Sequence, residues 1–164
     1  MCCTFVIHDL IYNAIINVAA LLGMALDLQA QFYLSINRLT EAETLWREAV
    51  SVGRQLHGDT GDQVLVVTNS LATVISMQEG RESEAADILE NVVETASKLN
   101  SPHVTSFLVN LGLVRMKQGL LDAAKSRCEG ARRLASSSGD QEVQQEADNC
   151  LQQVDLLLAQ KRQS

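Results

Sequence analysis

Hydrophobic and polar positions follow the same helical pattern in three stretches of the chain: residues 37–50 (NRLTEAETLWREAV), 80–93 (GRESEAADILENVV) and 119–132 (GLLDAAKSRCEGAR). The three stretches align without a gap. In each, a small Ala is followed after four and seven residues by further apolar or small side chains, which is the spacing of one face of an α-helix. The aligned positions are Ala42, Trp46 and Ala49; Ala85, Leu89 and Val92; and Ala124, Cys128 and Ala131.

Each of these predicted helices follows a residue that tolerates a positive φ angle, namely Asn37, Gly80 or Gly119. Three residues further on lies a side chain that is favoured at helix N-caps. These predicted caps are Thr40, Ser83 and Asp122. Each unit therefore predicts a helix, a tight turn and a capped second helix, with the small Ala where the two helices approach closely.

The third stretch contains GLLDAAKS, which differs by one residue from the phosphate-binding pattern G-x-x-x-x-G-K-[ST]. A phosphate-binding loop follows a β-strand, whereas residues 104–118 (VTSFLVNLGLVRMKQ) have apolar side chains at helical spacing. We therefore interpret Ala124 as a helix contact. Lys125 and Ser126 are expected on the solvent side of the second helix.

NLG at residues 110–112, the turn at Gly119 and the Ala positions that follow resemble the tetratricopeptide repeat, in which antiparallel helices pair. The resemblance implies an all-α solenoid of about three helix pairs plus flanking helices. Its repeats would cover about residues 18–56, 64–99 and 102–137. The second unit has SLA at 70–72 and one extra residue before Gly80, which predicts a bulged or shifted first helix. Trp46 could stack on a ligand, but its repeat position favours burial between helices.

The flanks of the array carry further helix signals. Residues 1–17 do not share the resemblance, which runs over residues 18–164. Ser101 and Pro102 are predicted to be the N-cap and the first residue of the third pair's first helix. Asp140 is predicted to open a capping helix over residues 140–162 that is apolar on one side only. The apolar side consists of Val143, Ala147, Leu151, Val154 and Leu158.

Composition supports an ordered all-α protein: 46% of the 164 residues are hydrophobic, 4% are aromatic and one is Pro. The formal net charge of −7 argues against nucleic-acid binding through a basic surface. The four cysteines lack the C-x-x-C spacing of metal sites, so we expect free thiols in a reducing compartment. They are Cys2, Cys3, Cys128 and Cys150.

No pattern of catalytic chemistry is present in the sequence. His8, His57 and His103 lie near the ends of separate segments, without a Ser–His–Asp or H-E-x-x-H arrangement. HGDTGD at residues 57–62 lacks the spacing of a calcium loop and is expected to join the first two units. We predict no catalytic residue, no cofactor and no metal, and therefore a non-enzymatic scaffold.

The N-terminal part is apolar over residues 5–28. Charged and amide side chains interrupt it, which disfavours a membrane-spanning helix. The interrupting residues are His8, Asp9, Asn13, Asn17 and Asp27. No Lys or Arg precedes Arg38, so neither a signal peptide nor a mitochondrial presequence is recognisable.

The order of LLGMALD at 21–27, SLAT at 70–73, QEGR at 78–81 and VNLGLVRMKQG at 109–119 resembles a mitochondrial branch of the tetratricopeptide repeat family. That resemblance implies a scaffold of the inner mitochondrial membrane. It also implies complex III subunits as partners and a role in clearing Rieske subunit fragments. Membrane association would then use segments outside this sequence. A kinesin-light-chain-like or co-chaperone-like adaptor for short peptides is the alternative, and an end piece of a larger solenoid is a third.

The surface on which a peptide would bind is expected on the first helices of the pairs, which line the inner face of such arrays. Asn side chains there can hold an extended peptide backbone. By the repeat register, the candidate groove residues are Gln29, Asn69, Asn110 and Arg115.

Overall fold

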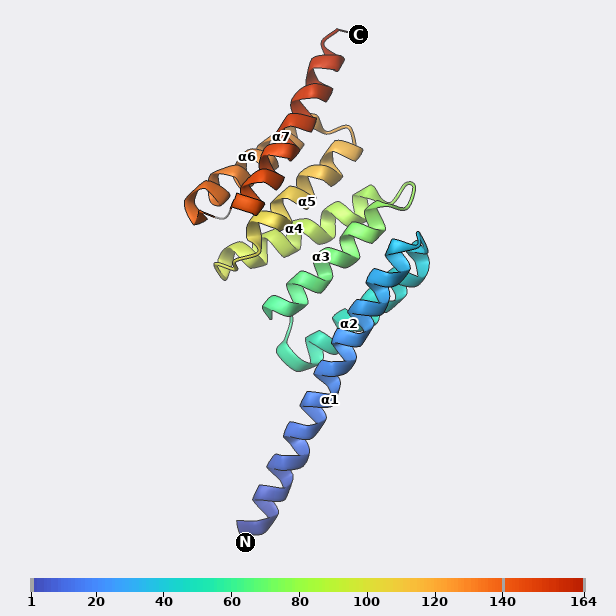
Figure 1. Ribbon diagram of the computed structural model, residues 1–164, viewed down its shortest axis with the longest axis vertical. Helices are drawn as coiled ribbons and strands as arrows, with labels where there is room; N and C mark the ends of the chain where they lie inside the picture. Colours follow the sequence, from blue (N-terminus) through green and yellow to red (C-terminus); the bar gives the residue numbers. More distant parts are fainter. Residues whose placement is uncertain (1, 140, 164) are drawn as a thin grey trace. The chain divides into compact units, whose positions relative to one another are not determined.

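The computed structural model describes the backbone of residues 2–139 and 141–163, and the side chains of that set except those of residues 2–12 and 138. The described residues form seven α-helices and no strand (Figure 1). The helices are α1 (Cys2–Ser35), α2 (Leu39–His57), α3 (Asp62–Ser76), α4 (Glu82–Lys98), α5 (Val104–Lys117), α6 (Leu121–Ser138) and α7 (Gln141–Lys161). The predicted all-α class is confirmed. The predicted cap Asp140 lies outside the described residues.

The chain divides into two compact units, Met1–Val67 and Thr68–Ser164. In the first, α1 packs against α2. In the second, α5 lies at the centre and packs against α4, α6 and α7, while α6 also packs against α7. The first turns of α3 belong to the first unit and the remainder to the second.

The turns between paired helices are fixed by backbone conformation. Asn37, Gly80 and Gly119 all have positive φ, as predicted, with angles of 58°, 77° and 73°. The Asn37 N–H donates a hydrogen bond to the Leu34 carbonyl, and the Arg38 N–H donates one to the Tyr33 carbonyl, each at 2.9 Å. This pair of bonds satisfies helix-end carbonyls and reverses the chain within one residue. Gly119 repeats the same two bonds.

The predicted N-caps are wrong by two positions. Thr40, Ser83 and Asp122 each occupy the second residue of a helix, because α2, α4 and α6 begin at Leu39, Glu82 and Leu121. The physical reason is the turn itself: the residue directly after the positive-φ position already serves as the N-cap of the next helix. In α4 the Ser83 hydroxyl instead accepts a hydrogen bond from Gln118 Nε2 at 3.2 Å.

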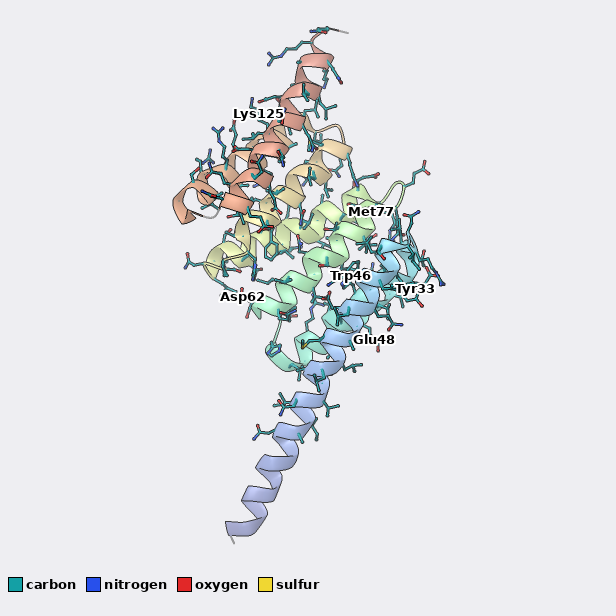
Figure 2. All side chains as sticks on the ribbon, in the orientation of Figure 1. Tyr33, Trp46, Glu48, Asp62, Met77 and Lys125 are labelled. Carbon is teal, nitrogen blue, oxygen red and sulfur yellow. A yellow bond between two sulfur atoms is a disulfide. The ribbon has the colours of Figure 1, made fainter. Side chains whose placement is uncertain are left out.

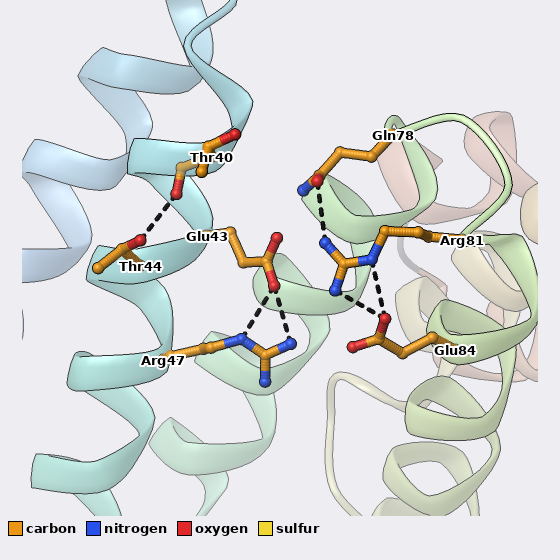
Figure 3. Close-up of polar contacts among 7 residues, drawn as sticks. All are labelled: Thr40, Glu43, Thr44, Arg47, Gln78, Arg81 and Glu84. Carbon is orange, nitrogen blue, oxygen red and sulfur yellow. Dashed lines mark hydrogen bonds and ion pairs between the residues drawn. The ribbon is translucent and has the colours of Figure 1, made fainter.

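At the starts of α2 and α4 the N-cap residue is an arginine, whose side chain binds a glutamate in the first turn of the helix. Arg81 Nε and Nη2 donate to Glu84 Oε2 at 2.9 and 2.6 Å, and its Nη1 donates to Gln78 Oε1 at 2.9 Å (Figure 3). Arg38 binds Glu41 in the same way, which lowers the pKa of that carboxyl. Each Glu lies in the first turn, where a negative charge also favours the helix dipole.

Two other helix ends differ from prediction. α5 begins at Val104 with His103 as its cap residue, so Ser101 and Pro102 precede the helix; Ser101 Oγ accepts from the His103 N–H at 3.3 Å. The extra residue of the second sequence repeat lies after α3. That helix is continuous and ends at Ser76, so the turn before Gly80 is longer.

The repeat positions form the core. Ala42, Ala85 and Ala124 are fully buried, as their close-approach role predicts. Trp46 is 2% exposed, so its predicted burial is confirmed. Its indole Nε1 donates to Asp27 Oδ1 of α1 at 2.7 Å, which satisfies the one polar atom of the ring (Figure 2).

The capping helix is held covalently. Cys128 of α6 and Cys150 of α7 form a disulfide with Cα atoms 5.8 Å apart, so the prediction of free thiols is wrong for this pair. Both residues are buried on facing sides of adjacent helices, together with Ala147 and Val154 of α7. This disulfide could not be predicted from a cysteine spacing motif, because the separation of 22 residues depends on how α6 and α7 pack.

Candidate protein-binding groove

A hollow of about 510 Å³ in the second unit lies along the first helices of the pairs, α3 and α5, and along α7. Its walls are mainly apolar, and two of the lining residues, Met77 and Leu157, are 46% and 39% exposed. Figure 2 labels Met77. The lining residues are Thr73, Ser76, Met77, Asn110, Leu113, Val114, Met116, Lys117, Gln153 and Leu157. We call this hollow the α3–α5–α7 groove.

The groove continues toward the start of α5. A neighbouring hollow of about 320 Å³ shares Asn110, Leu113 and Gln153 with it and adds Glu146 and Asn149 of α7. The two hollows therefore form one surface that follows α5 and α7. Such a surface suits an extended or helical segment rather than a compact small molecule.

Two hydrogen bonds join α3 to α5 beside the groove. Asn110 Nδ2 of α5 donates to Asn69 Oδ1 of α3 at 2.9 Å, so the structure brings these two predicted residues together. Lys117 Nζ donates to the Ser76 carbonyl at 2.9 Å, which satisfies a carbonyl at the end of α3. Asn110 retains its amide oxygen, for which no hydrogen bond is present among the described residues, to accept one from a ligand.

The other two predicted residues lie elsewhere. Arg115 is 16% exposed and points to α4, where its Nη2 binds Glu90 Oε1 at 2.6 Å, while Nη1 donates to Gln118. Gln29 is exposed on α1 of the first unit. Of the four predicted residues, Asn110 lines the groove, and Asn69 is its hydrogen-bond partner on α3.

Lys125 and Ser126 have no phosphate-loop setting. Gly119 follows α5, which is a helix and not a strand, and Lys125 Nζ binds Asp155 Oδ1 of α7 at 2.7 Å. This hydrogen bond raises the pKa of Lys125. Ser126 is exposed, as predicted.

Metal ligands and histidines do not gather at the groove in the described part of the chain. Among those residues no group of three or more His, Cys, Asp and Glu side chains is placed to hold a metal ion. His103 lies against the ring of Phe107, with centroids 6.1 Å apart, and His57 lines a hollow of about 440 Å³ in the first unit. The arrangement offers apolar surface and amides, which are the groups of a protein-binding site.

Sequence comparison finds relatives that are named as mitochondrial tetratricopeptide repeat proteins. It is 28% identical over 125 residues to the human tetratricopeptide repeat protein 19, mitochondrial, a match that covers 76% of this chain. The chain resembles tetratricopeptide repeat protein 19. The homologue of tetratricopeptide repeat protein 19 from Drosophila melanogaster is 24% identical over 149 residues, or 90% of this chain. The chain spans 33% of the human relative and 40% of the fly relative.

Solved structures agree on the fold. BtubC from P. vanneervenii superposes with a TM-score of 0.62 at 19% identity, covering 88% of this chain and 66% of that one. A Plasmodium falciparum C-terminal TPR-containing domain gives a TM-score of 0.58 at 16% identity, covering 89% and 94%. No protein-family model matches the chain. The fold is therefore a tetratricopeptide-repeat solenoid, as the resemblance to tetratricopeptide repeat protein 19 implies.

Several groove residues were not predicted. Lys117, Gln153 and Leu157 line the groove, but the first lies at the end of a helix and the others on the capping helix, which was assigned only an end-covering role. The feature that reveals these groove residues is the position of α7, which packs on α5 and α6 as the first helix of a further pair would. That position becomes visible only once the helices are packed.

Proposed function

We propose that this protein is a non-enzymatic scaffold that binds a segment of a partner protein in the α3–α5–α7 groove, within mitochondria. Its partners are subunits of respiratory complex III at the inner membrane, and its role is the clearance of fragments left by processing of the Rieske subunit. The observation that carries the proposal is the similarity to tetratricopeptide repeat protein 19 over 76–90% of the chain.

The groove supports a binding role on physical grounds. Met77 and Leu157 leave apolar surface exposed at its edge, and Asn110 offers an amide beside it. A bound segment would cover the apolar side chains, and the amide would hydrogen-bond to its backbone. Neither contact requires a catalytic group.

The test compares two neighbouring leucines of α7. Leu157 lines the groove and is 39% exposed, whereas Leu156 is 58% exposed and does not line it. Tagged full-length chain, Leu157→Glu and Leu156→Glu are expressed in cells, and their partners from isolated mitochondria are compared by quantitative mass spectrometry. We expect complex III subunits with the unaltered chain and with Leu156→Glu, and at least tenfold fewer with Leu157→Glu.

Two results would overturn the proposal. Recovery of cytosolic motor or chaperone components without respiratory subunits would leave the peptide-adaptor alternative. Equal recovery of complex III subunits with both leucine variants would place the binding surface outside the groove.

A further inference from the structure

The first helix of the array carries an apolar stripe that no described residue covers. Val18, Leu22 and Phe32 of α1, and Ile36 directly after its end, are 66%, 47%, 60% and 48% exposed. At about 100° per residue, these four positions fall within an arc of about 80° on one side of the helix. We call these four residues the α1 stripe. Exposed apolar surface of this kind marks an interaction site.

Repeat equivalence shows what the stripe corresponds to elsewhere in the molecule. α1 and α5 are both first helices of a pair, and both end two residues before a positive-φ turn residue, Asn37 or Gly119. Counting back from the turn, Phe32 is equivalent to Val114 and Gln29 to Leu111. The buried residues also agree in this register, because Leu26 and Leu108 are 7% and 9% exposed.

On α5 the equivalent side is buried by the second helix of the preceding pair. Leu111 and Val114 are 0% and 3% exposed. Leu111 lies beside Glu90 and Val93 of α4, and Arg115 on the same side pairs with Glu90. The α1 stripe thus has the register of a face that is covered by an amphipathic helix elsewhere in this chain.

The α1 stripe lacks the arginines that surround the equivalent side of α5. Glu90 of α4 is held by Arg115 and Arg127, and the equivalent positions on α1 and α2 are Tyr33 and Leu45. Between residues 10 and 36 the only charged side chain is Asp27, whose carboxylate accepts hydrogen bonds from Trp46 and Gln31. A fitting occupant therefore presents an apolar face without an acidic residue at its centre.

We propose that the α1 stripe binds an amphipathic helix of a partner protein in the way that α4 binds α5. This surface is separate from the α3–α5–α7 groove, and the inference does not rest on the proposed function. Protein is favoured over an anionic membrane surface because residues 1–37 contain no Lys or Arg, the side chains that hold interfacial helices on such membranes. By length and composition alone, Asn13–Ser35 could also cross a membrane, and the vesicle experiment below separates lipid from protein. The helix buries the stripe as a further layer of the solenoid.

The test uses a synthetic helix taken from the chain itself. The probe is a fluorescein-labelled peptide of residues 82–98 with Glu90→Leu, and its anisotropy is measured against the full chain. Val93 packs against the core of the second unit, so the same peptide with Val93→Asp is the control. We expect saturable binding of the probe, and at least tenfold weaker binding of the control.

Variants of the chain locate the binding surface. Phe32→Asp and Leu22→Asp alter the stripe, and Met24→Asp is the matched control because Met24 is 61% exposed on α1 and lies two residues from Leu22, on another side of the helix. Circular dichroism checks that each variant is folded. We expect at least tenfold weaker binding for both stripe variants and an unchanged affinity for Met24→Asp.

Three outcomes would overturn the inference. One is the absence of saturable binding, or equal loss in the stripe and Met24 variants. Another is stripe-dependent binding of the chain to phosphatidylcholine vesicles, which would make the surface a lipid contact. The third is a dimer in sedimentation velocity that Phe32→Asp dissociates, which would make a second copy the occupant.

Discussion

Small side chains at one repeat position set the distance between paired helices. Ala42, Ala85 and Ala124 are fully buried at equivalent places, and this role was predictable because all three stretches carry Ala there. The chemistry of the neighbouring position was less predictable. Trp46, Leu89 and Cys128 are all buried, but only the structure reveals that Trp46 is paired with Asp27 and Cys128 with Cys150.

Enlarging Ala124 tests the close approach. Ala124→Leu should lower the free energy of unfolding by about 1–3 kcal/mol, because extra methylenes in a packed core force neighbours apart. Chemical denaturation followed by circular dichroism measures the change. Ala123→Leu is the control, since Ala123 is exposed on the same helix and should tolerate the larger side chain. Similar losses in both variants would contradict the packing account.

Removing the carboxylate of Asp27 should leave the buried indole N–H of Trp46 without its acceptor. Asp27→Ala is expected to cost about 1–3 kcal/mol of unfolding free energy, the usual penalty for an unsatisfied buried donor. Trp46 is the only tryptophan, so its fluorescence reports unfolding directly. The same substitution in a Trp46→Phe background should cost clearly less. An equal cost in both backgrounds would mean that the hydrogen bond contributes nothing.

At the scale of helices, the sequence predicted which segments pair but not where each helix begins. The positive-φ residues Asn37 and Gly119 were identified correctly. The residue directly after each of them is the N-cap of the next helix, so Thr40 and Asp122 lie inside α2 and α6 and are not N-caps. The bonds of these turns engage backbone groups on both sides, which residue preferences alone do not reveal. The packing of α5, α6 and α7 against one another could likewise not be predicted from the spacing of apolar residues.

Two helical glycines should respond oppositely to alanine. A Cβ at Gly112 of α5 would lie 2.7 Å from Cys128 Sγ and 3.1 Å from Cys150 Sγ, so Gly112→Ala should destabilise the protein. At Gly130 of α6 the nearest atom would be Leu108 Cδ1 at 3.8 Å, so Gly130→Ala should stabilise it by about 0.5–1 kcal/mol. Thermal unfolding of both variants checks the signs. Stabilisation by Gly112→Ala would refute the tight contact.

Reducing the Cys128–Cys150 disulfide should loosen the capping helix. The bond closes a loop between residues 22 apart, and cross-links of that length contribute about 3 kcal/mol through the unfolded chain. Amide hydrogen exchange with and without a phosphine reductant measures the effect, which should be largest in α7 and small in α1 and α2. Unchanged exchange in α7 would show that packing alone holds it.

For the whole molecule, the repeat pattern was sufficient to predict an all-α solenoid, because the same spacing recurs in three stretches and each repeat needs its neighbours for burial. The groove that we propose as the binding surface was predictable only in part. Asn110 lines the groove and bonds to Asn69, whereas Arg115 binds Glu90 of α4. The contribution of α7 to the groove depends on its packing against α5, a contact that a single repeat does not encode.

The central claim is that a mitochondrial partner lies in the α3–α5–α7 groove, and site-specific photocrosslinking tests it most directly. A benzophenone amino acid is placed at Leu157 in the groove or at Leu156 beside it, and crosslinked products from mitochondria are identified by mass spectrometry. The account predicts crosslinks to a complex III subunit from position 157 and none from position 156. Equal crosslinking from both positions, or products from position 157 that contain no respiratory subunit, would contradict it.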